Sequence, residues 1–212
     1  LDSGQSEVIG DRAFHSKPGI ASELALSFML GMRKAGMAAT AKHFPGHGSV
    51  QGDSHHMIPV DKRSFEQLSN NDLVPFRVMI ASGVEGIMTA HVVYPQMDEL
   101  PPTFSPFWLQ KVLREELNYK GLVFSDDLSM AGAKIAGGPY DRAKAALVAG
   151  CDIVLVCNDT AALDEVIEGL SSAGLALPGE RLAAFAPKIQ IADNLRSSAD
   201  WQQAVDSVME IA

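Results

Sequence analysis

Residues 42–55 bring together the side chains of this chain that are best suited to chemistry near neutral pH. The segment carries His43, His47 and His55 together with Asp53, and three glycines and a proline interrupt it. Imidazoles titrate near neutral pH and bind metals, and glycines allow a backbone to turn back tightly. Because binding and catalytic residues concentrate on loops, this pattern indicates chemistry more than packing. We therefore expect the functional site here.

Within this loop, Asp53 and His55 are two residues apart, so on an extended segment their side chains face the same way. A carboxylate beside an imidazole holds its tautomer and raises its basicity, which makes His55 a competent proton shuttle. The alternative interpretation of His55 is a solvated loop histidine.

Four apolar runs recur along the chain, and each ends in polar residues that precede a loop and a helix-like stretch. The runs are nearly continuous in apolar or small residues, which is typical of strands buried on both faces. Strands that alternate with helices predict an α/β fold with a parallel sheet, open or closed into a barrel. We expect one domain over residues 1–212. The runs occupy residues 37–43, 86–91, 121–126 and 152–158.

Helices are predicted between these runs. Ser64 and Gln67 have the spacing of a capping box, which predicts a helix start. Asn71-Asp72 and Pro75 predict that this helix breaks and restarts. The other expected helices cover residues 106–117, 140–149 and 160–172.

Polar residues stand at the C-terminal end of every predicted strand: Lys42 with His43, then His91, Asp126 and Asn158. Parallel α/β folds place their active sites at that edge of the sheet. Asp126 is placed to act there as nucleophile, base or metal ligand. The alternative is that these residues only mark where buried strands reach the surface.

Two further interpretations concern the carboxylates. Asp127 follows the strand end and precedes an apolar position, so it is also suited to cap a short helix. The histidines, with Asp53 and Asp126, have the donor types of a zinc site. Their spacing matches no compact ligand motif, so we expect neither a metal nor a cofactor; a metal-dependent hydrolase is the alternative.

The composition narrows the class of protein. Seventeen basic and 26 acidic residues give a net charge of -9, and no long basic run is present, so nucleic acid is not an expected partner.

No apolar run approaches the roughly 20 residues that span a bilayer, and no secretory signal opens the chain. Cys151 and Cys157 flank a predicted strand about 20 Å long, too far apart for a disulfide. We expect a cytoplasmic protein with free thiols and no membrane contact.

Several of these segments resemble the bacterial β-N-acetylglucosaminidases of glycoside hydrolase family 3. The similarity is collinear from Leu1 to about Asn158. It rests on Lys42-His43-Phe44-Pro45-Gly46-His47-Gly48, Asp53-Ser54-His55, Ala90-His91-Val92 and Gly121-Leu122-Val123-Phe124-Ser125-Asp126-Asp127-Leu128-Ser129-Met130.

The resemblance implies a (β/α)8 barrel and a retaining exo-glycosidase. Such an enzyme removes terminal β-linked N-acetylglucosamine from muropeptides during peptidoglycan recycling in the cytoplasm. It implies that Asp126 is the nucleophile and that His55, assisted by Asp53, is the general acid and then base. Lys42, His43 and Arg12 match positions that contact the sugar. Transfer of the sugar to phosphate is an alternative outcome, because a neutral imidazole repels an anionic acceptor less than a carboxylate does.

In one respect the chain departs from the family pattern. Members of the family have further βα units before the position of Leu1, so the sequence resembles the C-terminal portion of the barrel. A barrel without these units has open sheet edges, which favour pairing with another copy of the chain. An inactive fragment is therefore a further alternative.

Overall fold

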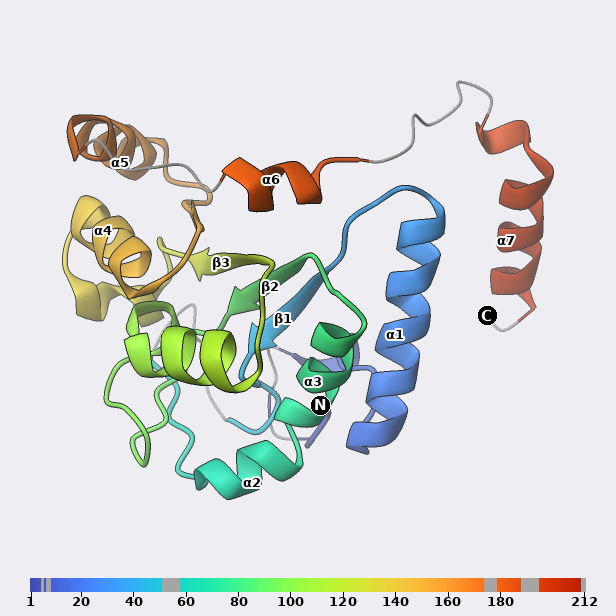
Figure 1. The fold of residues 1–212 in the computed structure, drawn as a ribbon, viewed down its shortest axis with the longest axis horizontal. Coiled ribbons are helices and arrows are strands. Elements are labelled where there is room, and N and C mark those ends of the chain that lie inside the picture. Colours follow the sequence, from blue (N-terminus) through green and yellow to red (C-terminus); the bar gives the residue numbers. More distant parts are fainter. Residues whose placement is uncertain (5, 7–8, 51–57, 174–178, 188–194, 211–212) are drawn as a thin grey trace.

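A four-stranded parallel sheet forms the centre of the molecule (Figure 1). The computed structural model describes residues 1–4, 6, 9–50, 58–173, 179–187 and 195–210. The strands follow one another in the sheet as they do along the chain, which confirms the predicted parallel α/β arrangement. They are β1 Thr40–Phe44, β2 Gly86–Thr89, β3 Leu122–Asp127 and β4 Ile153–Leu155. Three of the strands are shorter than the predicted runs: β1 begins only at Thr40, and β2 and β4 end before His91 and Asn158, which lie beyond the hydrogen-bonded ladder.

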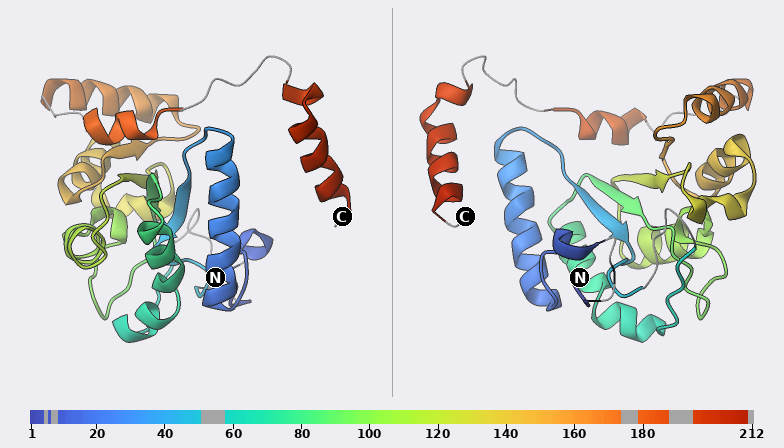
Figure 2. Two further views of the ribbon diagram at one scale, coloured as in Figure 1. Left: turned by 45° about the vertical axis from the view of Figure 1, so that its right-hand side comes forward. Right: turned by 180° about the vertical axis from the view of Figure 1, so that it is seen from behind.

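The helices that connect the strands lie where the sequence predicts them, and Ser64 and Gln67 form the complete capping box. The main helices are α1 Pro18–Lys34, α2 Phe65–Asn70, α3 Leu73–Ala81, the π-helix η3 Phe107–Glu116, α4 Pro139–Ala149, α5 Thr160–Ala173, α6 Gly179–Phe185 and α7 Ala199–Met209. Short 3-10 helices are η1 Gly10–Arg12, η2 Pro102–Phe104, η4 Ala131–Ala136 and η5 Leu195–Ser197. Helix α7 stands apart from the sheet, beyond α1 (Figure 2).

The hydrophobic core lies between the sheet and its covering helices. Trp108 is fully buried at its centre, with its ring 6.1 Å from that of Phe44 and 5.2 Å from that of Tyr94. Ile87 and Val123 of the middle strands are also fully buried. Burial of these large side chains fixes which face of each strand turns toward the helices, because side chains alternate along a strand.

The opposite face of the sheet borders a cavity of about 700 Å³. Thr40, Met88 and Phe124 line it from the three adjacent strands β1, β2 and β3. Helix α6 covers part of this face, where the ring of Phe185 lies 5.4 Å from that of Phe124. The sheet therefore has one fully packed face and one face that borders a large apolar space.

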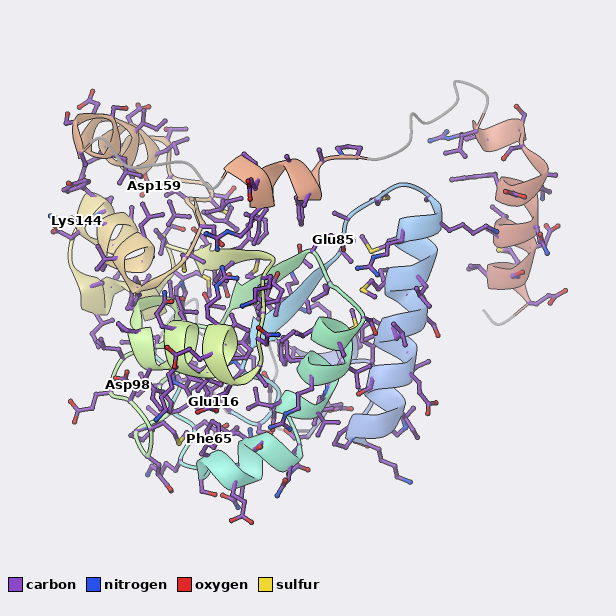
Figure 3. The ribbon with its side chains drawn as sticks, in the orientation of Figure 1. Phe65, Glu85, Asp98, Glu116, Lys144 and Asp159 are labelled. Carbon is purple, nitrogen blue, oxygen red and sulfur yellow. The ribbon has the colours of Figure 1, made fainter. Side chains whose placement is uncertain are left out.

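Glu85, just before β2, ties the other end of the sheet together (Figure 3). Its carboxylate accepts hydrogen bonds from Arg33 Nε at 2.8 Å and from the Ala39 N–H at 3.1 Å. The Tyr119 hydroxyl donates to its carbonyl at 3.0 Å. Burial opposes ionisation of Glu85, but the bonds from Ala39 and Arg33 outweigh it and lower the pKa of this carboxyl. These bonds join α1 to the beginnings of β1 and β2, at the edge of the sheet opposite to the C-terminal strand ends.

Two smaller expectations can be compared with the structure. Cys151 and Cys157 are free, as predicted from their spacing. In the described part of the chain, no helix combines the length and the apolar character that crossing a membrane requires.

Candidate active site

Polar side chains from three strands meet at the C-terminal edge of the sheet. Lys42 and His43 belong to β1, His91 follows β2, and Asp126 belongs to β3. The structure thus brings His43 and Asp126, which are far apart in the sequence, within 3.8 Å of each other. The carboxyl ends of parallel strands share one edge, which is why the strand-end pattern predicted this meeting.

His43 and Asp126 form the centre of the site. His43 Nε2 lies 3.8 Å from Asp126 Oδ2, and the two side chains are only 11% and 15% exposed. The other oxygen of Asp126, Oδ1, accepts the N–H of Asp127 at 2.8 Å. One carboxylate oxygen is therefore held by the backbone, while the other is directed toward the imidazole.

His43 is a neutral group at physiological pH. Burial lowers its pKa to about 4; Asp126 opposes this shift, whereas His47, Lys42 and Arg12 add to it. Its Nδ1 is buried and has no hydrogen-bond partner among the described residues. A neutral imidazole with an unused nitrogen can exchange a hydrogen bond with a hydroxyl group of a substrate.

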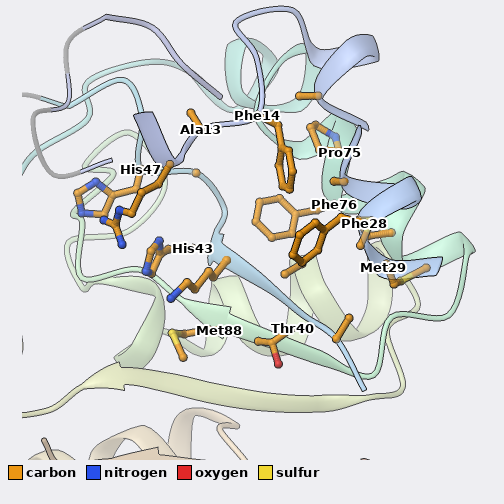
Figure 4. Close-up of a pocket in the computed structure, with 18 of the residues that line it drawn as sticks. Ala13, Phe14, Phe28, Met29, Thr40, His43, His47, Pro75, Phe76 and Met88 are labelled. Atoms are coloured by element: carbon orange, nitrogen blue, oxygen red, sulfur yellow. The ribbon is translucent and has the colours of Figure 1, made fainter. Parts of the chain in front are cut away.

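The cavity next to this centre has a polar end and an apolar end (Figure 4). His43 and His47 lie at the polar end, with their rings 5.8 Å apart. Arg12 and Lys42 line the same cavity, so the three residues matched to sugar contacts share one space. The apolar end is lined by aromatic and methionine side chains, among them Phe14, Phe28, Met29 and Phe76.

Asp127 has a structural role, but not the predicted one. Its carboxylate accepts the N–H of Ser129 at 2.9 Å, the Ser129 hydroxyl at 2.6 Å and the N–H of Cys157 at 2.9 Å. The following helix, η4, has Met130 at its N-cap, so the helix-capping interpretation of Asp127 is wrong. Its bonds instead close the turn after β3 and attach that turn to the end of β4.

His91 lies behind the strand ends, outside the residues that line the cavity. It is fully buried, and its two ring nitrogens lie 3.1 Å from Thr103 Oγ1 and 3.1 Å from the carbonyl of Asp127. Its strand-end position predicted that it belongs near the site, and this is confirmed, but its side chain contacts the strand that carries Asp126 and not the cavity.

His55 and Asp53 lie in residues 51–57, outside the described residues. The structure describes the chain on both sides of this segment. Before it, the carbonyl of Gly46 accepts a hydrogen bond from the Tyr94 hydroxyl. After it, Val60 forms a parallel bridge with Val93. Both flanks of the segment are thus attached to the chain just after β2.

A buried ion cluster supports these flanks, and the sequence analysis missed it. Arg63 donates to Asp61 through Nε and Nη2 and to Asp72 through Nη1 at 2.7 Å. Asp61 and Asp72 are 4% and 2% exposed. Asp72 in turn contacts the loop, since a Cβ on Gly46 would stand 2.6 Å from Asp72 Oδ1. No short-range sequence pattern predicts such a cluster. From the sequence, Asp72 was therefore interpreted only as part of a helix break.

Within the described ranges, no group of three or more histidine, cysteine, aspartate or glutamate side chains is arranged to hold a metal ion. The donors that the structure does bring together are one carboxylate, one neutral imidazole and two cations. This arrangement suits a neutral ligand that carries several hydroxyl groups.

Comparison with known proteins shows the family to which the chain belongs. The family described as "Glycosyl hydrolase family 3 N terminal domain" matches residues 2–191. A beta-hexosaminidase of Methylococcus capsulatus is 52% identical over 211 residues, which are 98% of this chain and 63% of that protein. One of Idiomarina loihiensis is 58% identical over 163 residues, 77% of this chain and 49% of that protein. The chain belongs to glycosyl hydrolase family 3.

Solved structures of the family share its fold. The crystal structure of NagZ from Neisseria gonorrhoeae in complex with N-trifluoroacetyl-D-glucosamine superposes with a TM-score of 0.87 at 40% identity, over 98% of this chain and 60% of that one. The native structure of the same protein gives a TM-score of 0.88 at 41% identity, over 100% and 62%. The fold is therefore the α/β fold of this family's barrels. The chain spans about half to two thirds of the length of these relatives.

Proposed function

We propose that this protein is a retaining exo-β-N-acetylglucosaminidase, which hydrolyses a terminal β-linked N-acetylglucosamine. The observation that carries the proposal is the geometry of Asp126: the Asp127 N–H binds one of its oxygens, and the other lies 3.8 Å from Nε2 of His43, which lines the cavity together with Lys42 and Arg12. Membership of family 3 and relatives named beta-hexosaminidase support it. The bound N-trifluoroacetyl-D-glucosamine of the Neisseria gonorrhoeae relative supports the choice of sugar.

The first chemical step follows from the two environments of the Asp126 oxygens. Asp126 Oδ2 attacks the anomeric carbon, and the bond from that carbon to the leaving oxygen breaks. His55 begins this step as an imidazolium that Asp53 stabilises, gives its proton to the leaving oxygen and ends the step neutral. The hydrogen bond from the Asp127 N–H keeps Asp126 Oδ1 in place during the attack. The product of this step is a covalent glycosyl-enzyme ester.

In the second step, water attacks the same carbon from the side that the leaving group vacated. Neutral His55 accepts the proton of this water, and the bond to Asp126 breaks. Two displacements at one carbon retain the β configuration. A histidine in place of the usual second carboxylate is the feature that sets this scheme apart from most retaining glycosidases.

Lys42, His43 and Arg12 bind the sugar in this scheme. Neutral His43 accepts a hydrogen bond from a sugar hydroxyl or donates one to it, and the two cations donate to sugar oxygens. Muropeptides released from peptidoglycan, processed in the cytoplasm, are the proposed natural substrates, in line with the resemblance to cell-wall recycling enzymes.

The test is release of a chromophore from an N-acetylglucosaminide by the full-length protein. Asp126→Ala and His55→Ala should each lower kcat by at least about 100-fold, since each removes a group that acts in the transition state. Asp164→Ala removes an exposed carboxylate of α5 and serves as the matched control, with activity expected to stay at the wild-type value. Near-normal turnover by both site variants would refute the proposal.

The same assay identifies the acceptor. With water as acceptor, the rate is independent of added phosphate and free N-acetylglucosamine accumulates. A rate that depends on phosphate, with formation of a sugar phosphate, would show that the reaction is phosphorolysis and not hydrolysis. The role of Asp126 as nucleophile would be unchanged.

A further inference from the structure

Behind the candidate nucleophile, three side chains and two backbone carbonyls form a continuous hydrogen-bond chain. His91 lies 3.1 Å from the Asp127 carbonyl through Nε2 and 3.1 Å from Thr103 Oγ1 through Nδ1. Thr103 Oγ1 is 2.8 Å from Thr89 Oγ1, which also lies 3.3 Å from the carbonyl of Phe124. His91, Thr89 and Thr103 are all fully buried. This hydrogen-bond chain joins the end of β2, the short helix η2 and the end of β3.

The directions of the two hydrogen bonds of His91 follow from the carbonyl of Asp127, which cannot donate. A backbone carbonyl only accepts, so His91 Nε2 must carry a hydrogen that it donates to Asp127. A neutral imidazole then has an unprotonated Nδ1, which accepts the hydroxyl hydrogen of Thr103. Thr103 Oγ1 is left as an acceptor, and the hydroxyl of Thr89 can donate to it. One tautomer of His91 therefore satisfies both of its ring nitrogens, while the single hydrogen of the Thr89 hydroxyl is donated either to Thr103 Oγ1 or to the carbonyl of Phe124.

The surroundings of His91 keep it neutral. Burial lowers its pKa, and the nearby charges of Asp126 and Asp127 only partly oppose this, while His47 adds to the lowering. The ring of Phe104 lies nearly parallel to it, 5.9 Å away, and restricts its rotation. The imidazole is thus fixed in position, orientation and tautomer.

We propose that His91 is a positioning residue that fixes the strand end carrying Asp126, with Thr103 holding its tautomer. Asp127 is the link: its N–H binds Asp126 Oδ1, and its carbonyl binds His91. The role of His91 in turnover rests on the proposed function of Asp126. Displacement of a reacting group by about 1 Å can lower a rate about 100-fold, so such support should be visible in kcat.

Four variants of the full-length protein separate this role from simple packing. His91→Leu fills a similar volume without a donor, whereas His91→Gln keeps an N–H near the position of Nε2. Thr103→Val removes only the hydroxyl, whereas Thr103→Ser keeps it. We expect His91→Leu to lower kcat about 100-fold and Thr103→Val about 10-fold, with little change in KM. His91→Gln and Thr103→Ser should regain most of the lost rate.

The nitrogen NMR spectrum of the histidine side chains tests the hydrogen-bond chain without using activity. We expect Nε2 of His91 to be protonated and Nδ1 to be unprotonated in the wild-type protein at neutral pH, with the signals assigned by their absence in His91→Gln. Protonation at Nδ1, or at both nitrogens, would overturn the inference.

The kinetic results distinguish failure of this inference from failure of the proposed function. If Asp126→Ala is inactive while His91→Leu and Thr103→Val turn over like wild type, the positioning role alone is wrong. An equal loss of kcat in Thr103→Val and Thr103→Ser would also overturn it, because the hydroxyl would then not matter. If Asp126→Ala is active, the proposed function fails. The NMR spectrum then still decides whether the hydrogen-bond chain through His91 exists. Should His91→Leu not fold, the two Thr103 variants carry the kinetic test.

Discussion

At the scale of single residues, Asp126 and Asp127 show that neighbours in the sequence can have different roles. Asp127 has its carboxylate oxygens occupied by Ser129 and Cys157, so its role is to close a turn. Asp126 has one oxygen bound to the backbone and the other facing His43. Hydrogen-bond partners, not residue type, separate a structural carboxylate from one available for chemistry.

This difference predicts that replacement by asparagine lowers stability at Asp127 but activity at Asp126. Asp127→Asn should lower the free energy of unfolding by about 1–2 kcal/mol, because it weakens hydrogen bonds to a charged acceptor. Asp126→Asn should change stability by less than about 0.5 kcal/mol and abolish turnover. Urea unfolding and a glycosidase assay on both variants check this; equal destabilisation by the two would contradict it.

His43 gives a pH dependence whose sign follows from its environment. Its pKa falls from 6.5 in the unfolded chain to about 4 in the folded protein, so below pH 6.5 the unfolded state binds more protons. Stability is therefore lost between pH 6.5 and 4, by about 2–3 kcal/mol from this residue. His43→Asn should remove that part of the acid sensitivity.

Urea unfolding of wild type and His43→Asn at several pH values from 7.5 to 4 measures the effect. The difference in unfolding free energy should change over the window from 6.5 to 4 and be constant above 7. A difference that does not vary with pH would show that His43 titrates alike in both states.

At the scale of elements, the cluster of Arg63, Asp61 and Asp72 holds the chain after β1 against α3. Asp72 lies at the N-terminus of α3 and against Gly46, while Asp61 forms a backbone hydrogen bond to Val93 after β2. One guanidinium thus joins three separate parts of the chain. Predicting this cluster from the sequence would require knowing that residues 46, 61, 72 and 93 meet.

Removal of the cation should be costly here, because both carboxylates are buried. Arg63→Leu should lower the free energy of unfolding by about 3–5 kcal/mol, the usual effect of leaving buried charges without a partner. Arg181→Leu is the matched control: it breaks the pair with Asp152 at 2.9 Å, but its own side chain is 42% exposed, so we expect about 0–1 kcal/mol. Similar losses in the two variants, measured by urea unfolding, would contradict this account.

At the scale of the whole molecule, the part of the sheet that the structure describes has two unpaired edges. Among the described residues, β1 pairs only with β2, and β4 pairs only with β3. Apolar side chains of α1 and α3 line part of the cavity next to β1. Unpaired strand edges beside apolar surface favour association with another chain.

We therefore expect the 212-residue chain, prepared on its own, to associate as its concentration rises. Light scattering coupled to gel filtration would show an average mass above 22.6 kDa that increases with loading. The full-length protein at the same concentrations is the control. A constant mass of one chain over the whole range would show that the edges do not pair.

Local patterns in the sequence determined the elements and the edge at which the site forms. Continuous apolar runs predicted buried strands, Ser64 and Gln67 predicted the start of α2, and the polar residues after each run predicted where side chains would gather. These features depend on neighbours along the chain and on the rule that parallel strands share one direction. These features can therefore be predicted from the sequence alone.

The tertiary structure alone decided which polar side chains face the cavity and which support it from behind. His43 and Asp126 meet across two strands, His91 turns toward the carbonyl of Asp127, and Arg63 bridges two buried carboxylates. Each of these contacts joins residues that are distant in the sequence or depends on which face of a strand a side chain occupies. Packing of the helices against one face of the sheet fixes those directions, and that packing is a property of the whole fold.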